Sequence, residues 1–177
     1  LAAIGRASLA RGPDGPMEFA STLRQAGAFE KNADLPVSMG IALLADTRAE
    51  GLSTETLARW AEEGGPLAPL AARALPGRDT EAVRSRIKRL LAGTDPIIRA
   101  HTALGLATDP ETDAVSLLVE AYRFEEDASV RRAVIRALSA RKEPQRRATL
   151  ELARDLDPDD AVRALARAAL GGRSLLP

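Results

Sequence analysis

The chain has 177 residues, and its 25 Lys and Arg balance 25 Asp and Glu, so the formal net charge is zero. The summed field therefore gives no long-range attraction to nucleic acid or to an anionic membrane. Cysteine is absent, which excludes disulfides, thiolate metal sites and a cysteine nucleophile. No apolar run approaches the roughly 20 residues that a membrane-spanning helix needs.

The sequence begins at Leu1, and residues 1–10 read as the second helix of a hairpin whose first helix is missing. The turn cluster 12–16 (Gly-Pro-Asp-Gly-Pro) ends this segment. We interpret residues 1–10 as a half repeat. We therefore expect the chain to be an excerpt or processed form of a larger protein. We expect a soluble protein and prefer the cytoplasm, with the periplasm as an alternative because the N-terminus reads as truncated.

Five further pairs of helical segments follow in one register, with an apolar residue at position zero of each second helix. The step between these positions is 31 or 32 residues, and they are Leu35, Leu67, Ile98, Val130 and Val162. Positions four, seven and eight continue the same helical face. The seventh is always small, which predicts a close crossing by a neighbouring helix: Ala42, Ala74, Gly105, Ala137 and Ala169.

The first helix of each pair is predicted at residues 17–31, 54–63, 81–91, 113–124 and 145–155. Inward stripes are expected in the last three of them, at Val83, Ile87, Leu90 and Leu91, then Val115, Leu118, Val119 and Tyr122, then Ala148, Leu152 and Leu156. A period of about 32 residues with two helices per unit predicts units that bury their apolar faces only by stacking. The predicted fold is therefore all-α, a right-handed α-solenoid of about five helical hairpins plus an N-terminal half repeat.

We expect one solenoid over residues 1–177, with degenerate repeats at 1–76 and regular repeats at 77–172. Pro76-Gly77 separates the two sets. The tail 173–177 contains Ser-Leu-Leu, and we expect it either to fold back as a cap or to mark where the native chain continues.

The phrases DASVRRAVIRAL (127–138) and DDAVRALARAAL (159–170) resemble the second helix of HEAT repeats, a family of armadillo-like α-solenoids. An acidic residue lies three places before position zero and an arginine one place after it. These residues form the structural ladder of Asp95, Asp127, Asp159, Arg99, Arg131 and Arg163. We expect some of the arginines to pair with the aspartates.

Arginine outnumbers lysine by 22 to 3 and is the most suggestive surface feature. On the second helices, positions one, two, five and six after zero point away from the core, toward the expected concave surface. Two basic clusters stand out, one at 84–89 and one at 131–147. Arg73, Arg132 and Arg136 are the arginines that we expect to be free there for a partner.

Other candidate residues have structural interpretations that we prefer. His101 is the single histidine, and by analogy with the other repeat copies its position on the second helix is at least half-buried. No Ser and Asp are recognisably arranged around it. The acids at 155, 157, 159 and 160 resemble the opening of a calcium loop, but helix capping explains them without the missing Gly and Glu. Trp60 and Tyr122 are expected in the core, with a partner anchor as the alternative.

No catalytic, cofactor-binding or metal-binding residue is predicted, and we expect no enzyme and no cofactor. The leading hypothesis is a HEAT-like scaffold that binds a protein partner, or another part of its parent protein, on the concave face. One alternative is nucleic-acid binding with or without glycosylase activity, since some bacterial HEAT-like proteins cradle DNA. A second alternative is a chaperone similar to the HEAT-like bilin lyases. The oligomeric state is open.

Overall fold

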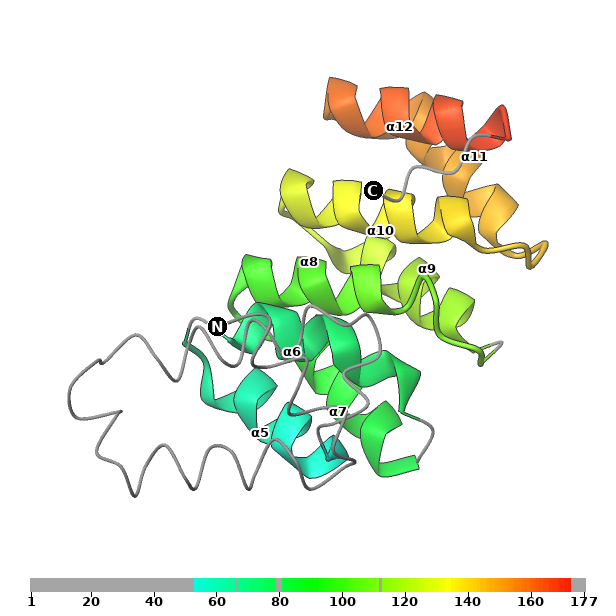
Figure 1. Ribbon diagram of the computed structural model, residues 1–177. Coiled ribbons are helices and arrows are strands. Elements are labelled where there is room, and N and C mark those ends of the chain that lie inside the picture. The colour runs from blue at the N-terminus through cyan, green and yellow to red at the C-terminus, as the bar shows by residue number, and fades with distance from the viewer. Residues whose placement is uncertain (1–52, 66, 79–80, 112, 173–177) are drawn as a thin grey trace, which may run out of the picture. The chain divides into compact units, whose positions relative to one another are not determined.

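The structure is a computed structural model, and it describes residues 53–65, 67–78, 81–111 and 113–172. Within these ranges it contains helices and no strand (Figure 1). The chain forms two compact units, Leu1–Ala74 and Leu75–Pro177, and each is described by itself. The predicted half repeat 1–10, the first helix pair at 17–45 and the tail 173–177 lie outside the described residues. The repeat number and the handedness stay predictions.

In the first unit, α5 (Thr54–Glu63) and α6 (Ala68–Ala74) form a hairpin. Ser53 caps α5, because its side chain accepts a hydrogen bond from the Thr56 backbone N–H at 3.1 Å. The turn between the helices uses Gly64 and Gly65 at φ values of 80° and 87°, where a side chain would be strained. The shared interior is filled by Leu57 and by alanines at positions 58, 61, 68, 71 and 72.

The second unit begins with the short 3-10 helix η1 (Leu75–Gly77) and continues as three helical hairpins. Their helices are α7 (Glu81–Leu91), α8 (Pro96–Gly105), α9 (Ala114–Phe124), α10 (Ala128–Ala140), α11 (Arg146–Leu156) and α12 (Asp160–Leu170). The second helices stack in order, α8 against α10 and α10 against α12 (Figure 1). The predicted α-solenoid is confirmed for this unit, with helix boundaries within a residue or two of the predicted ones.

The core of this unit lies along the predicted face of the second helices. In α10, Val130, Val134, Ala137 and Leu138 are each at most 1% exposed. Ala137 and Ala169 occupy the small seventh position and are buried, as is Gly105. Because α10 packs against both α8 and α12, a long side chain at this position would have to displace a neighbouring helix.

Each of these second helices starts at an aspartate whose carboxylate caps it. Asp95 accepts a hydrogen bond from the Ile97 N–H at 2.8 Å, and Asp159 accepts one from the Val162 N–H at 2.9 Å. Asp127 does the same for Ser129 at 2.7 Å. The N-terminal N–H groups of a helix have no partner inside the helix, so these carboxylates stabilise each helix start.

The predicted inward stripe of α11 is wrong. Leu152 is 50% exposed and Leu156 is 73% exposed, and Ala148 is exposed as well. The buried residues are instead Thr149, Leu150 and Ala153, which stand 32 residues after Leu117, Leu118 and Ala121 of α9. The stacking of successive repeats sets which face of α11 is covered, and apolar identity alone does not.

Candidate interaction surfaces

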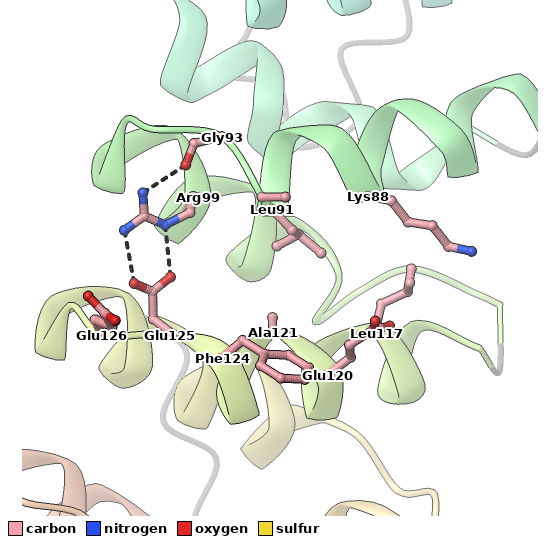
Figure 2. A pocket seen from close by; sticks show the side chains of 11 residues that line it. Lys88, Leu91, Gly93, Arg99, Leu117, Glu120, Ala121, Phe124, Glu125 and Glu126 are labelled. Carbon is pink, nitrogen blue, oxygen red and sulfur yellow. Dashed lines mark hydrogen bonds and ion pairs between the residues drawn. The ribbon is translucent and has the colours of Figure 1, made fainter.

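The turns between the two helices of successive repeats are tied together by arginines at position one of the second helices. Arg99 binds Glu125 with two parallel hydrogen bonds, Nε to Oε2 at 2.8 Å and Nη2 to Oε1 at 2.9 Å. Its remaining Nη1 donates to the Gly93 carbonyl of its own turn (Figure 2). The same Nη1 also donates to the Thr94 carbonyl. One guanidinium thus holds two turns, in the bidentate geometry that strengthens such pairs.

Arg131 repeats this arrangement one unit further along. Its Nε and Nη2 bind Asp157 at 2.9 and 3.1 Å, and Nη1 donates to the Glu126 carbonyl at 2.7 Å. The Tyr122 hydroxyl also donates to Asp157, at 2.6 Å. The Asp157 side chain is 1% exposed and that of Arg131 is 10% exposed. This buried cluster couples α9, α10 and the end of α11.

These contacts correct the expected pairing of the arginines with the aspartate ladder. Asp95, Asp127 and Asp159 cap their helices and form no ion pair with Arg99, Arg131 or Arg163 in the part of the chain that the structure describes. The partners of Arg99 and Arg131 stand two residues before the next cap, because a side chain from one repeat reaches the turn of the next. Arg163 pairs with Asp160 on its own helix and donates to the Asp157 carbonyl.

Much of the predicted basic clusters also serves the fold. Arg84 binds Asp109 at 2.7 Å. Arg141 is buried and donates to the Asp109 and Glu111 carbonyls while pairing with Glu143. These arginines link the loops between repeats, so their charges are not available for binding a partner.

Acid is expected to weaken the fold through Asp157. Burial by itself raises the pKa of this carboxyl, but hydrogen bonds from Arg131 and Tyr122 outweigh burial and lower it overall. A carboxyl with a lowered folded-state pKa contributes stability above its unfolded value of about 3.9, and this is lost as the pH falls through the folded-state pKa. Urea denaturation of the wild type should therefore give a free energy of unfolding that declines below about pH 4.

The variant Asp157→Asn isolates this contribution, because the other carboxyls with lowered pKa values, such as Asp127 and Glu143, remain in it. Its free energy of unfolding should be lower at neutral pH and should depend less on pH in the acid range. Parallel pH curves for the two proteins would mean that Asp157 does not contribute through its charge.

The three arginines predicted as partner-binding residues fall in both units. Arg73 is exposed on α6, Arg136 is exposed on α10, and Arg132 is half-buried on α10. None of them forms an ion pair within the described ranges, and Arg132 Nε donates to the Ala128 carbonyl at 3.2 Å. Arg132 and Arg136 lie one helical turn apart and share one side of α10.

We call the exposed sides of α8, α10 and α12 the second-helix face. The positions equivalent to Arg132 and Arg136 are Ala100 and Leu104 on α8 and Ala164 and Ala168 on α12. Acidic residues are absent from the described helices α8 and α10, and α12 has one, Asp160 in its first turn, which is already paired with Arg163. The two arginines of α10 are therefore flanked by small and aliphatic side chains without a competing carboxylate.

The remaining candidate residues have structural positions. Tyr122 is buried against Asp157, and burial together with this hydrogen bond raises the pKa of its hydroxyl. It therefore packs in the core and is no exposed anchor, while Trp60 is half-buried on α5. His101 is half-buried on α8. The residues that the structure describes contain no cluster of His, Cys, Asp and Glu able to hold a metal ion.

Sequence reasoning missed Glu125 and Asp157 as the partners of the arginines. A signal was present, because both pairs are 26 residues apart and each acid stands two residues before a capping aspartate.

Among the described helices, none has the length and apolar character that a bilayer crossing requires.

The stacked hairpins place the chain in the class of tandem helical-repeat proteins. A family model for HEAT repeats matches residues 70–171, which is more than half of the chain, and the chain belongs to this family. Neither the comparison with curated proteins nor that with solved structures found a match. HEAT repeats generally mediate protein–protein interactions.

Proposed function

We propose that the chain is a non-catalytic HEAT-repeat scaffold that binds a protein partner on its second-helix face, the side expected to be concave. The observation that carries this proposal is the charge distribution of that face. Arg132 and Arg136 carry positive charge without a carboxylate partner, on a helix flanked by small side chains. Opposite charge on a partner guides its approach and orientation, so we infer that the partner presents an acidic segment.

The proposed surface is separate from the groups that hold the repeats together. Arg99, Arg131 and Arg141 are engaged by carboxylates and carbonyls, so their removal would disturb the fold. Arg136 makes no such contact through its side chain, and the hydrogen bond from Arg132 to the Ala128 carbonyl stays within α10. Charge changes at Arg132 and Arg136 therefore leave the contacts between repeats in place, and this makes the face testable.

The test is a titration of a fluorescent peptide of alternating Glu and Ala into the chain, followed by anisotropy. The double variant Arg132→Glu and Arg136→Glu should bind this probe at least about tenfold more weakly, since two attractive charges become repulsive. The matched control reverses Arg123 and Arg147, which are exposed on the first helices α9 and α11, and it should bind as the wild type does. Equal binding by both double variants would refute the assignment of this face.

Nucleic-acid binding is the alternative outcome of the same experiment. A duplex DNA probe in place of the peptide should show a steep loss of affinity with salt if this alternative holds. The zero net charge favours a protein partner. The bilin lyase hypothesis finds no supporting residue on this face.

A further inference from the structure

A second surface of interest is a groove in the second unit, between the first helices of two successive repeats. α7 packs on α8 and α9 packs on α10, and the space between α7 and α9 has a volume of about 590 Å³. Leu91, Leu117 and Ala121 face this space, and Phe124 lies at its edge (Figure 2). The groove is thus apolar along its middle and is bounded by two helices.

Exposed apolar side chains continue from this groove onto α11. The large apolar residues exposed within the described ranges are four, and three of them are on first helices: Phe124 at 73%, Leu152 at 50% and Leu156 at 73%. Phe124 and Leu156 are each the last residue of their helix and stand 32 residues apart. Leu152 precedes Leu156 by one turn. We call the groove and these three residues the first-helix strip.

The exposure of the strip does not arise from a missing neighbour. Phe124 stays 73% exposed although α11 packs beside α9, so this position points away from the next repeat. Leu156 occupies the equivalent position on α11, and a further repeat stacked on α11 would leave it similarly exposed. Exposed apolar residues that gather in one strip mark an interaction site more often than scattered ones do.

The charges around Phe124 indicate what kind of surface would cover it. Glu120 lies one turn before Phe124 and Glu126 two residues after it, and both carboxylates are exposed. Neither forms an ion pair in the described part of the chain, whereas Glu125 is occupied by Arg99. Lys88 lies at the opposite end of the groove from Glu126 (Figure 2). The Phe124 end of the first-helix strip is therefore flanked by carboxylates that a cationic side chain could pair with.

We propose that the first-helix strip is a second docking site, which takes an amphipathic helix with an apolar face and basic margins from a partner protein. A helix suits a groove between two helices, because its apolar side chains at i, i+3, i+4 and i+7 can enter it in a row. Basic margins complement Glu120 and Glu126. The same two carboxylates disfavour an anionic membrane surface as the occupant.

The probe for this proposal is a labelled peptide of about 18 residues, five helical turns, with leucine on one face and lysine on the other. A peptide with glutamate in place of lysine is the matched probe. The wild type should bind the Leu/Lys peptide at least about tenfold more tightly than the Leu/Glu peptide. Phe124→Ser and Leu156→Ser should each weaken binding of the Leu/Lys peptide by about tenfold, as loss of an apolar anchor does.

The charge contribution is tested by Glu120→Gln together with Glu126→Gln, which should weaken binding of the Leu/Lys peptide and reduce its dependence on salt. The matched control Glu81→Gln lies at the start of α7 and should leave binding unchanged. Arg136→Glu on the second-helix face should also leave it unchanged. This site can therefore fail while the proposed function stands, and the reverse also holds.

Four results would overturn the proposal. The first is equal binding of both peptides, and the second is unchanged binding by Phe124→Ser and Leu156→Ser when their circular dichroism melting curves match the wild type. The third is self-association of the wild type in sedimentation equilibrium that Phe124→Ser abolishes, since the strip would then join two copies. The fourth is co-sedimentation with phosphatidylglycerol vesicles that depends on Phe124, which would assign the strip to a membrane.

Discussion

Replacing Arg131 by alanine is expected to lower the free energy of unfolding by about 3–5 kcal/mol, the usual cost of removing one partner of a buried ion pair. Asp157 would keep its place at 1% exposure without the guanidinium that neutralises it. The Glu126 carbonyl would lose a donor as well. Urea denaturation at neutral pH, followed by far-UV circular dichroism, measures the change.

The matched control is Arg147→Ala. Arg147 pairs with Glu151 at the same 2.9 Å, but their side chains are 76% and 39% exposed. Water already solvates both charges, so this change should stay within about 0.5 kcal/mol. Equal losses from the two variants would show that burial adds nothing to the Arg131–Asp157 pair, against the expectation.

The pH dependence gives a second test of the same variant. With Arg131 gone, Asp157 loses the strongest of the partners that lower its pKa and keeps the hydrogen bonds from Tyr122 and the Asp159 N–H, so its pKa should be higher than in the wild type. Protonation in mild acid then relieves the buried charge, so the difference in stability between the wild type and Arg131→Ala should shrink as the pH falls. A difference that stays constant with pH would mean that lost packing, and not an unpaired charge, causes the destabilisation.

The position of Arg131 also affects how the repeats unfold together. Its guanidinium joins the turn of the α9–α10 hairpin to the turn of the α11–α12 hairpin. In a repeat protein, cooperativity rests on such contacts between neighbouring units. We therefore expect Arg131→Ala to broaden the urea transition and lower its slope, with the α11–α12 hairpin unfolding first.

Helix α10 could be predicted well from the sequence because two neighbouring second helices constrain it. It packs between α8 and α12, so its face must carry small and aliphatic residues at fixed positions, as Val134 and Ala137 do. Capping aspartates mark where the helices start. The chemical identity and the position of these residues thus indicate the same structure.

The contacts between repeats could not be predicted in the same way. Arg99 and Arg131 were visible, but the partner of each lies in the turn of another repeat, and only the stacking geometry decides which acid the guanidinium reaches. Likewise, the first helices are covered on fewer sides. An apolar residue such as Leu156 can therefore stand outside the core even when its spacing is helical.

α11 offers a direct test of this difference between spacing and burial. Leu150 is 1% exposed and Leu156 is 73% exposed, although both are leucines on one helix. Leu150→Ala is expected to lower the free energy of unfolding by about 2–5 kcal/mol, through lost burial and the cavity left behind. Leu156→Ala should change it by less than about 0.5 kcal/mol. Urea denaturation of both variants at one pH gives the comparison.

The sequence-based prediction placed Leu156 in the core, and it requires Leu156→Ala to lower the free energy of unfolding by several kcal/mol, as expected for a buried leucine. A loss of that size would support the predicted stripe and contradict the structure. If the loss is confined to Leu150→Ala, Leu156 contributes little to folding, and its exposed side chain is left to make contacts outside the chain. The same leucine is part of the first-helix strip. A stable Leu156→Ser protein that no longer binds the Leu/Lys peptide would then separate folding from docking at a single residue.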